Sequence, residues 1–258
     1  MLKKRLIAVV IVRDNIVVQS VNFSKFYPIG SPKTVIENLN RWNVDEILLL
    51  DISATRNFKE PNMKLVEEIG SMGVSTPLSY GGGISNFEQA KKIISCGFER
   101  ISINQSFFNN LNFFKEISYH IGSQAIILSY PCTYFKNNFF YFDYIKRKKK
   151  LINFDVIKKN KKYFSEILLM DISGDGRMDK FSDKLFNFFK KKKIDDLLLF
   201  GGLTNLSQIK DYINYPKVKG IGIGNSLNYT ENAYQKIKED LSKINVSQIR
   251  NPVYQNEN

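Results

Sequence analysis

The sequence predicts an α/β fold, a (β/α)8 TIM barrel that consists of two half-barrels. Three runs of the first half recur 120 residues later: LLLDIS at 48–53 recurs as LLMDIS at 168–173, YGGG at 80–83 as FGG at 200–202, and RISIN at 100–104 as GIGIG at 220–224. Each is an apolar run before a polar or glycine-rich turn, which is typical of a buried parallel strand that ends at a loop. The length of 258 residues agrees, since such barrels have roughly 250.

Strands and helices alternate along the chain, which favours a parallel sheet. Apolar runs bounded by turns predict strands near 5–12, 46–51, 76–80, 99–103, 124–130, 165–171, 195–200 and 218–224. Helical spacing of apolar residues predicts helices at 32–41, 62–69, 85–95, 107–120, 154–163, 180–191, 205–213 and 230–243. Ser85 and Glu88 have the spacing of a capping box and are predicted to begin the third helix. The aromatic stretch 139–144 beside the run Lys146–Lys150 predicts a hairpin with a solvated face.

One domain is expected at 1–244, with half-barrels of about 1–120 and 121–244, because no linker rich in proline, serine or glycine divides the chain. Residues 245–258 form a polar C-terminal tail. The stretch Leu6–Val12 follows three basic residues as in a signal peptide, but it is short and lacks a cleavage site. It is predicted to be the first strand.

Composition narrows the class of protein. A hydrophobic content of 43% is sufficient for a sizeable core, and no run of about 18 apolar residues is present to span a membrane. Cys96 and Cys132 are the only cysteines, so neither a metal site nor a disulfide framework is expected, and a cytoplasmic location fits. The net charge of +13 accompanies much Asn, Ile, Phe and Tyr, as a biased genome produces, so no nucleic-acid or membrane partner is expected. No cofactor is expected.

Two glycine-rich turns predict two phosphate sites, because functional residues of such barrels follow the C-terminal ends of the strands. Glycine lets the backbone approach a ligand closely and present its amide hydrogens. The first site, called the first cup, has Gly81, Gly82 and Gly83 after the third strand and Asn104 and Gln105 after the fourth. The second cup has Gly201 and Gly202 after the seventh strand and Gly224, Asn225 and Ser226 after the eighth. One cup in each half predicts a small molecule with a phosphate at both ends.

The motifs then resemble a known family over nearly the whole chain. They are VNF at 21–23, Glu46 with LDI at 50–52, YGGG at 80–83, SIN at 102–104, GSQ at 122–124 and Asp175-Gly176, in the family's order. They are similar to the cyclase (synthase) subunit of imidazole glycerol phosphate synthase. The resemblance implies a glutaminase docked on the N-terminal face of the barrel, ammonia passing along the barrel axis, and cyclisation of a ribulosyl bisphosphate at the C-terminal face. It also adds Asp175 and Gly176 to the second cup.

The family's chemistry depends on two carboxylates, at the ends of the first and fifth strands, that act as general acid and base. The matching positions here are Ile11 and Pro131, and neither side chain can carry a proton. Each such loss typically costs on the order of 10²-fold to 10⁴-fold in rate. No catalytic residue of the ordinary reaction is therefore expected, although Asp51 and Asp175 are possible substitutes.

The resemblance implies a ring of alternating charges around the entrance of the ammonia path. The matching residues are Arg5, Glu46, Arg100 and Glu166, and all four have the family's sign. Each lies at the start of a predicted strand, where a barrel core favours apolar residues. Such charges require each other, since an unpaired buried charge costs several kcal/mol. A stabilising salt-bridge cluster is the alternative to a gate.

These features predict a cyclase-like subunit of a glutamine-dependent amidotransferase complex that channels ammonia without cyclising. The sequence is similar to a divergent branch associated with acetamidino sugars of bacterial surface polysaccharides, which implies a sugar amidotransferase as a further partner. Two alternatives stay open: a working cyclase of histidine biosynthesis, which is a lyase, and a protein that binds a phosphorylated metabolite.

Overall fold

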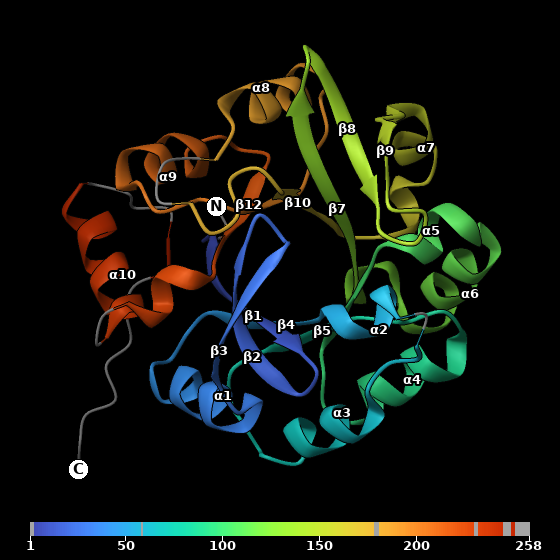
Figure 1. The fold of residues 1–258 in the computed structure, drawn as a ribbon, viewed down its shortest axis with the longest axis horizontal. Coiled ribbons are helices and arrows are strands. Elements are labelled where there is room, and N and C mark those ends of the chain that lie inside the picture. The colour runs from blue at the N-terminus through green and yellow to red at the C-terminus, as the bar shows by residue number, and fades with distance from the viewer. Residues whose placement is uncertain (1–2, 58, 178–180, 230–231, 245–248, 251–258) are drawn as a thin grey trace.

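The computed structural model describes residues 3–57, 59–177, 181–229, 232–244 and 249–250. Eight parallel strands close into a barrel, and the (β/α)8 prediction is confirmed (Figure 1). Their order around the barrel is β1 (Arg5–Arg13), β4 (Glu46–Asp51), β5 (Leu78–Gly81), β6 (Arg100–Ile103), β7 (Ile126–Phe135), β10 (Glu166–Asp171), β11 (Leu197–Phe200) and β12 (Val218–Ile223). The pairing of β12 with β1 and of β7 with β10 leaves no open edge in this ring of strands.

Helices surround the barrel on the outside (Figure 1). They are α1 (Pro32–Arg41), α2 (Ile52–Arg56), α3 (Met63–Gly70), α4 (Phe87–Ser95), α5 (Gln105–Asn109), α6 (Leu111–Ile121), α7 (Phe154–Lys159), α8 (Asp183–Lys191), α9 (Leu206–Ile213) and α10 (Ala233–Lys243). The capping box predicted at Ser85 and Glu88 is wrong. The N-cap of α4 is Asn86, whose side-chain oxygen accepts a hydrogen bond from Gln89 N. The helix predicted at 107–120 is divided at Asn110, which caps α6. No described helix is long and apolar enough to cross a bilayer.

Two hairpins extend the barrel strands at the C-terminal face. β2 (Ile16–Val21) and β3 (Lys25–Gly30) follow β1, and β8 (Asn138–Asp143) and β9 (Lys148–Leu151) follow β7. The second hairpin confirms the prediction for 139–150, whereas the first was missed. Asp14 and Asn15, with φ of 51° and 63°, form the turn between β1 and β2, as two-residue hairpin loops require.

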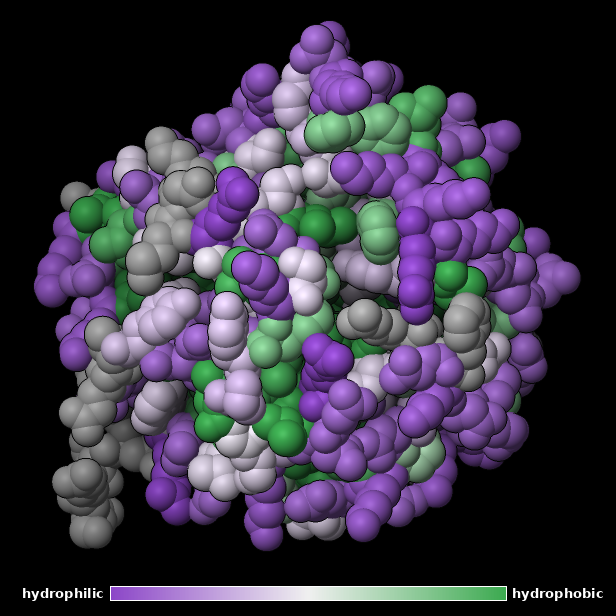
Figure 2. All heavy atoms as spheres, in the orientation of Figure 1, coloured by the Kyte–Doolittle hydropathy of each residue, from purple (hydrophilic) through white to green (hydrophobic). Residues whose placement is uncertain are grey.

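The core has two layers. Side chains on the outer face of the strands pack against the helices, and an inner cluster fills the barrel. The inner cluster contains Ile7, Val9, Ile11, Leu48, Leu50, Ile127, Leu168, Met170, Leu198 and Phe200 of the barrel strands. Figure 2 shows hydrophobic residues near the centre of one face, within a hydrophilic rim. The barrel is thus a packed core rather than an open pore.

The internal repeat is confirmed in three of its strand pairs and corrected in the fourth. Ile11 pairs with Leu50 as Pro131 pairs with Met170, which is the spacing of 120 residues. On β5, however, Gly81 pairs with Leu50 and Ser102, whereas on β11 the residue that pairs with Met170 and Gly222 is Phe200. Phe200 therefore matches Gly81, not Tyr80. Because side chains alternate across a strand, this slip of one residue turns Phe200 into the barrel.

At the C-terminal end, Ile249 forms an isolated parallel bridge with Lys4, and Arg250 N donates to Lys4 O at 3.3 Å. The other positions of the predicted polar tail lie outside the described residues.

Candidate functional site

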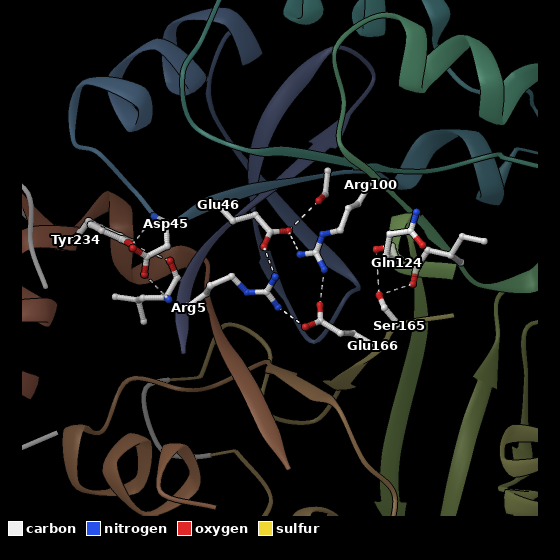
Figure 3. Close-up of polar contacts among 11 residues, drawn as sticks. Arg5, Asp45, Glu46, Arg100, Gln124, Ser165, Glu166 and Tyr234 are labelled. Atoms are coloured by element: carbon white, nitrogen blue, oxygen red, sulfur yellow. Dashed lines mark hydrogen bonds and ion pairs between the residues drawn. The ribbon is translucent and has the colours of Figure 1, made fainter. Parts of the chain in front are cut away.

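Four charged side chains converge at the N-terminal face of the barrel, as Figure 3 shows. Glu46 and Glu166 each bind both Arg5 and Arg100, so four ion pairs close a ring. Arg5 Nη1 lies 3.4 Å from Glu46 Oε2, and the other three pairs are direct hydrogen bonds. Exposed fractions of 19%, 3%, 12% and 11% for Arg5, Glu46, Arg100 and Glu166 show that the ring is largely withdrawn from solvent. We call these four residues the charge ring.

The surroundings hold the charge ring in place. Asp45 accepts from Leu6 N at 2.8 Å and from Lys238 Nζ at 2.7 Å, which ties the start of β4 to the start of β1 and to α10. Ser79 donates to Glu46 Oε1 at 2.8 Å. Burial disfavours the charge of Arg100, but the two glutamates outweigh it and raise the pKa of its guanidinium above the ordinary value. The Arg100 guanidinium is therefore charged near neutral pH.

A cavity of about 570 Å³ opens at the opposite, C-terminal face. Its size lies within the roughly 300 to 1,000 Å³ that is usual for small-molecule sites. Asp51, the three glycines of the first cup, Asn104 and Gln105 all line it, so the structure brings these predicted site residues together. Ser102 and Ser129 also line it, and their hydroxyl oxygens lie 2.7 Å apart.

The first cup combines a tight turn with polar side chains. Gly82 and Gly83 have φ of 143° and 71°. A Cβ on Gly82 would lie 2.4 Å from Asp51 O, so only glycine fits there. Asn104 donates to Ser129 O at 2.9 Å, and the Gln105 amide contacts the Tyr141 hydroxyl at 2.5 Å. These contacts hold both side chains at the cavity wall.

The predicted residues of the second cup all line a separate hollow of about 30 Å³: Asp175, Gly176, Gly201, Gly202, Gly224, Asn225 and Ser226. Three of them also contact the β2–β3 hairpin. Asp175 Oδ2 accepts from Ser20 Oγ at 2.6 Å and from Phe23 N at 2.9 Å. Asn225 donates to Ser20 O at 2.7 Å. Gly176 packs on β2 so closely that a Cβ would lie 2.3 Å from Ser20 O. Burial raises the pKa of Asp175 to about 6.

Ile11 and Pro131, the two positions at which the resemblance implies carboxylates, are both buried apolar residues. Ile11 is 3% exposed within the inner cluster, and Pro131 is buried beside Met170 on the neighbouring strand. Of the two possible substitutes, only Asp51 lines the large cavity. Burial raises its pKa, against hydrogen bonds from the amides of Ser53 and Ala54 that lower it. Asp175 instead binds the β2–β3 hairpin.

Sequence analysis missed the part of the cavity wall that the hairpins supply. Phe23 and Phe26 come from the first hairpin, and Phe142, Tyr144 and Arg147 come from the second. The Tyr144 hydroxyl is buried and has no hydrogen-bond partner among the described residues. The sequence signal for the hairpins was their turn residues. Asp14-Asn15 and Lys136-Asn137 have positive φ at the turns that follow β1 and β7, and asparagine and aspartate are typical of such turns.

Comparisons with known proteins agree with the fold. The family model described as "Histidine biosynthesis protein" matches residues 5–233. A protein of Vibrio vulnificus (strain YJ016), provisionally named imidazole glycerol phosphate synthase subunit hisF2, is 28% identical over 262 residues, 99% of this chain and 95% of the relative. A protein of Leptospira interrogans, provisionally named imidazole glycerol phosphate synthase subunit HisF, is 30% identical over 233 residues, 89% and 91% of the two chains. Imidazole glycerol phosphate synthase subunit HisF of Thermotoga sp. (strain RQ2) is 28% identical over 204 residues, 78% and 80% of the two chains.

Proposed function

The chain belongs to the histidine biosynthesis protein family, and we propose that it is a cyclase-type subunit that delivers ammonia without cyclising the usual substrate. The observation that carries this proposal is the contrast between the two faces of the barrel. The N-terminal face holds a complete ring of four paired charges, whereas the apolar residues Ile11 and Pro131 stand where the resemblance implies carboxylates at the C-terminal face.

The charge ring suits an entrance for a small neutral molecule. Its charges neutralise each other, so opening one ion pair exposes a polar gap without leaving a net charge behind. A glutaminase docked on this face releases ammonia next to the ring. An ion crossing the same gap has to shed its hydration shell, which is costly in a low-dielectric interior.

Hydroxyl groups lead from the ring toward the cavity along one inner wall. Ser79 on β5 contacts Glu46, and Ser102 and Ser129 follow on β6 and β7, where they line the cavity. Ammonia accepts and donates hydrogen bonds, so this wall offers it successive partners. The next strands around the barrel, β10 and β11, supply the apolar side chains of Leu168, Met170 and Leu198.

The molecule that receives the ammonia is proposed from what the cavity lacks and from the resemblance. Without acid and base at Ile11 and Pro131, the cavity lacks the groups that the cyclase reaction requires. From the resemblance, we propose that the acceptor is a sugar of a surface polysaccharide. A sugar amidotransferase would then be the third component of the complex. A cytoplasmic complex fits this role.

The test compares nitrogen sources in the assembled complex. Arg100→Met is expected to lose most glutamine-driven product formation and to keep activity with added ammonium salt, because free ammonia reaches the acceptor without crossing the ring. Lys217→Ala is the matched control, since it removes an exposed ion pair with Asp195 from the same face. Equal loss with both nitrogen sources, or no association with a glutaminase, would show that the ring is a salt-bridge cluster without a transport role.

A further inference from the structure

The two cups are not equivalent. The first opens into the cavity of about 570 Å³, whereas the second retains about 30 Å³, and the two spaces share no lining residue. At roughly 10 to 15 Å³ for each water molecule, the second space holds only two or three waters. The enclosed space at the second cup is therefore far smaller than at the first.

The one-residue slip on β11 explains part of this difference. Phe200 points into the barrel where the first half has Gly81. Its ring lies over β12, and a Cβ on Gly222 or Gly224 would approach it to 3.1 Å or 3.0 Å. The two glycines therefore make room for the ring. Phe23 packs edge-on against Phe200, with ring centroids 6.5 Å apart.

The β2–β3 hairpin packs against two residues of the second cup, Asp175 and Asn225. Ser20 and Phe23 both donate to the Asp175 carboxylate, and Asn22 N donates to Asp175 O at 2.9 Å. Asn225 holds the backbone of Ser20 on both sides, since it accepts from the amide and donates to the carbonyl. Asp175 and Asn225, which sequence analysis assigned to phosphate, thus hold this hairpin while they also line the hollow.

We propose that the cavity binds a ligand with a single phosphate-bearing end, held at the first cup, and that the second cup binds no phosphate. The proposal rests on the proposed function, because it names the class of molecule at the acceptor end of the ammonia path. Asn104, Ser106 and the glycine turn surround the phosphate end, and Lys59 and Arg147 stand exposed at the rim beside Glu60. A monophosphorylated sugar fits this space, whereas a bisphosphate that spans the barrel does not.

Stoichiometry tests the proposal directly. Titration calorimetry with inorganic phosphate is expected to give one site per chain. Ribose 5-phosphate and ribulose 1,5-bisphosphate are expected to bind within about threefold of each other, because the second phosphate stays in solvent. Two phosphate sites per chain, or a bisphosphate that binds more than tenfold tighter than the monophosphate, would overturn the proposal.

The repeat provides a matched pair of variants. Ser106 and Ser226 occupy equivalent positions in the two cups, and each follows directly after its strand-end loop. Ser106→Asp places a negative charge in the first cup and is expected to weaken phosphate binding at least tenfold. Ser226→Asp is expected to leave binding within twofold of the parent protein. Circular dichroism and thermal unfolding verify that both variants fold.

The outcomes separate this inference from the proposed function. Equal weakening by both variants, or no phosphate binding by the parent protein at millimolar concentration, would overturn the single-phosphate proposal. Neither outcome affects the comparison of glutamine with ammonium salt, which depends on the opposite face. Failure of that comparison would in turn leave the phosphate stoichiometry unchanged.

Discussion

Removing Arg100 should destabilise the barrel strongly, because its guanidinium binds both glutamates of the charge ring. Arg100→Met leaves Glu46 and Glu166, at 3% and 11% exposure, to share Arg5 alone. Removing one partner from a buried ion pair typically costs about 3–5 kcal/mol. In a chain of this size, each kcal/mol lowers the melting temperature by about 2–4 °C, so the expected decrease is roughly 6–20 °C.

A double-mutant cycle with Glu166→Gln shows whether the four charges act as a unit. Glu166→Gln alone leaves two arginines facing Glu46, and Arg100→Met alone leaves two glutamates facing Arg5. The double variant is neutral again and keeps the pair of Arg5 and Glu46. It should therefore lose less stability than the two single variants together, by about 0.5–3 kcal/mol.

Urea unfolding of the four proteins measures this coupling, and Lys217→Ala is the control. Its ion pair with Asp195 has exposed fractions of 47% and 43%, so the expected cost is at most about 1 kcal/mol. If Arg100→Met costs no more than Lys217→Ala, or the two changes add within about 0.5 kcal/mol, the ring is not a coupled buried cluster.

Two further predictions concern the C-terminal face. With saturating ammonium salt, the purified protein should turn over the ribulosyl bisphosphate of the histidine pathway at least about 100-fold more slowly than an ordinary family enzyme. The reason is that Ile11 and Pro131 supply neither acid nor base. A steady-state rate within about tenfold of the rate of an ordinary family enzyme would refute this. Burial raises the pKa of Asp175 from 3.8 to about 6, so this group favours the folded state below pH 4 and loses that contribution, about 3 kcal/mol, as pH rises through 6. Urea unfolding between pH 4 and 7 should show a weaker decline for Asp175→Asn than for the parent protein, and parallel profiles would contradict the assignment.

The barrel could be predicted because its strands depend on local patterns, and apolar runs placed the eight barrel strands to within a few residues. The charge ring was predicted from the resemblance to the family, which pointed to Arg5, Glu46, Arg100 and Glu166 at the starts of four strands. Their opposite signs then required pairing. The structure places all four in contact, while their role as a gate stays a prediction.

The difference between the two cups could not be predicted in the same way. The match of YGGG to FGG suggested equal spacing, but strand pairing with Met170 and Gly222 decides which face Phe200 occupies. One glycine fewer in the second turn was the only sign of the slip. Sequence analysis did not predict the contacts of Asp175 and Asn225 with the first hairpin, because contacts with a segment 150 or more residues away leave no local pattern.

The charge ring is difficult to explain by stability alone. Well-packed apolar residues in place of a buried ion-pair cluster are often neutral or stabilising by about 1–4 kcal/mol. The inner cluster shows that this barrel accommodates such residues, since Ile7, Leu48 and Leu168 belong to it. A cluster of four paired charges, held by Asp45 and Ser79, therefore fits the proposed passage of a small polar molecule better than a purely stabilising role. In that proposal, Ile11 and Pro131 at the other end of the barrel mark where the molecule is delivered rather than where it reacts with the family's usual substrate.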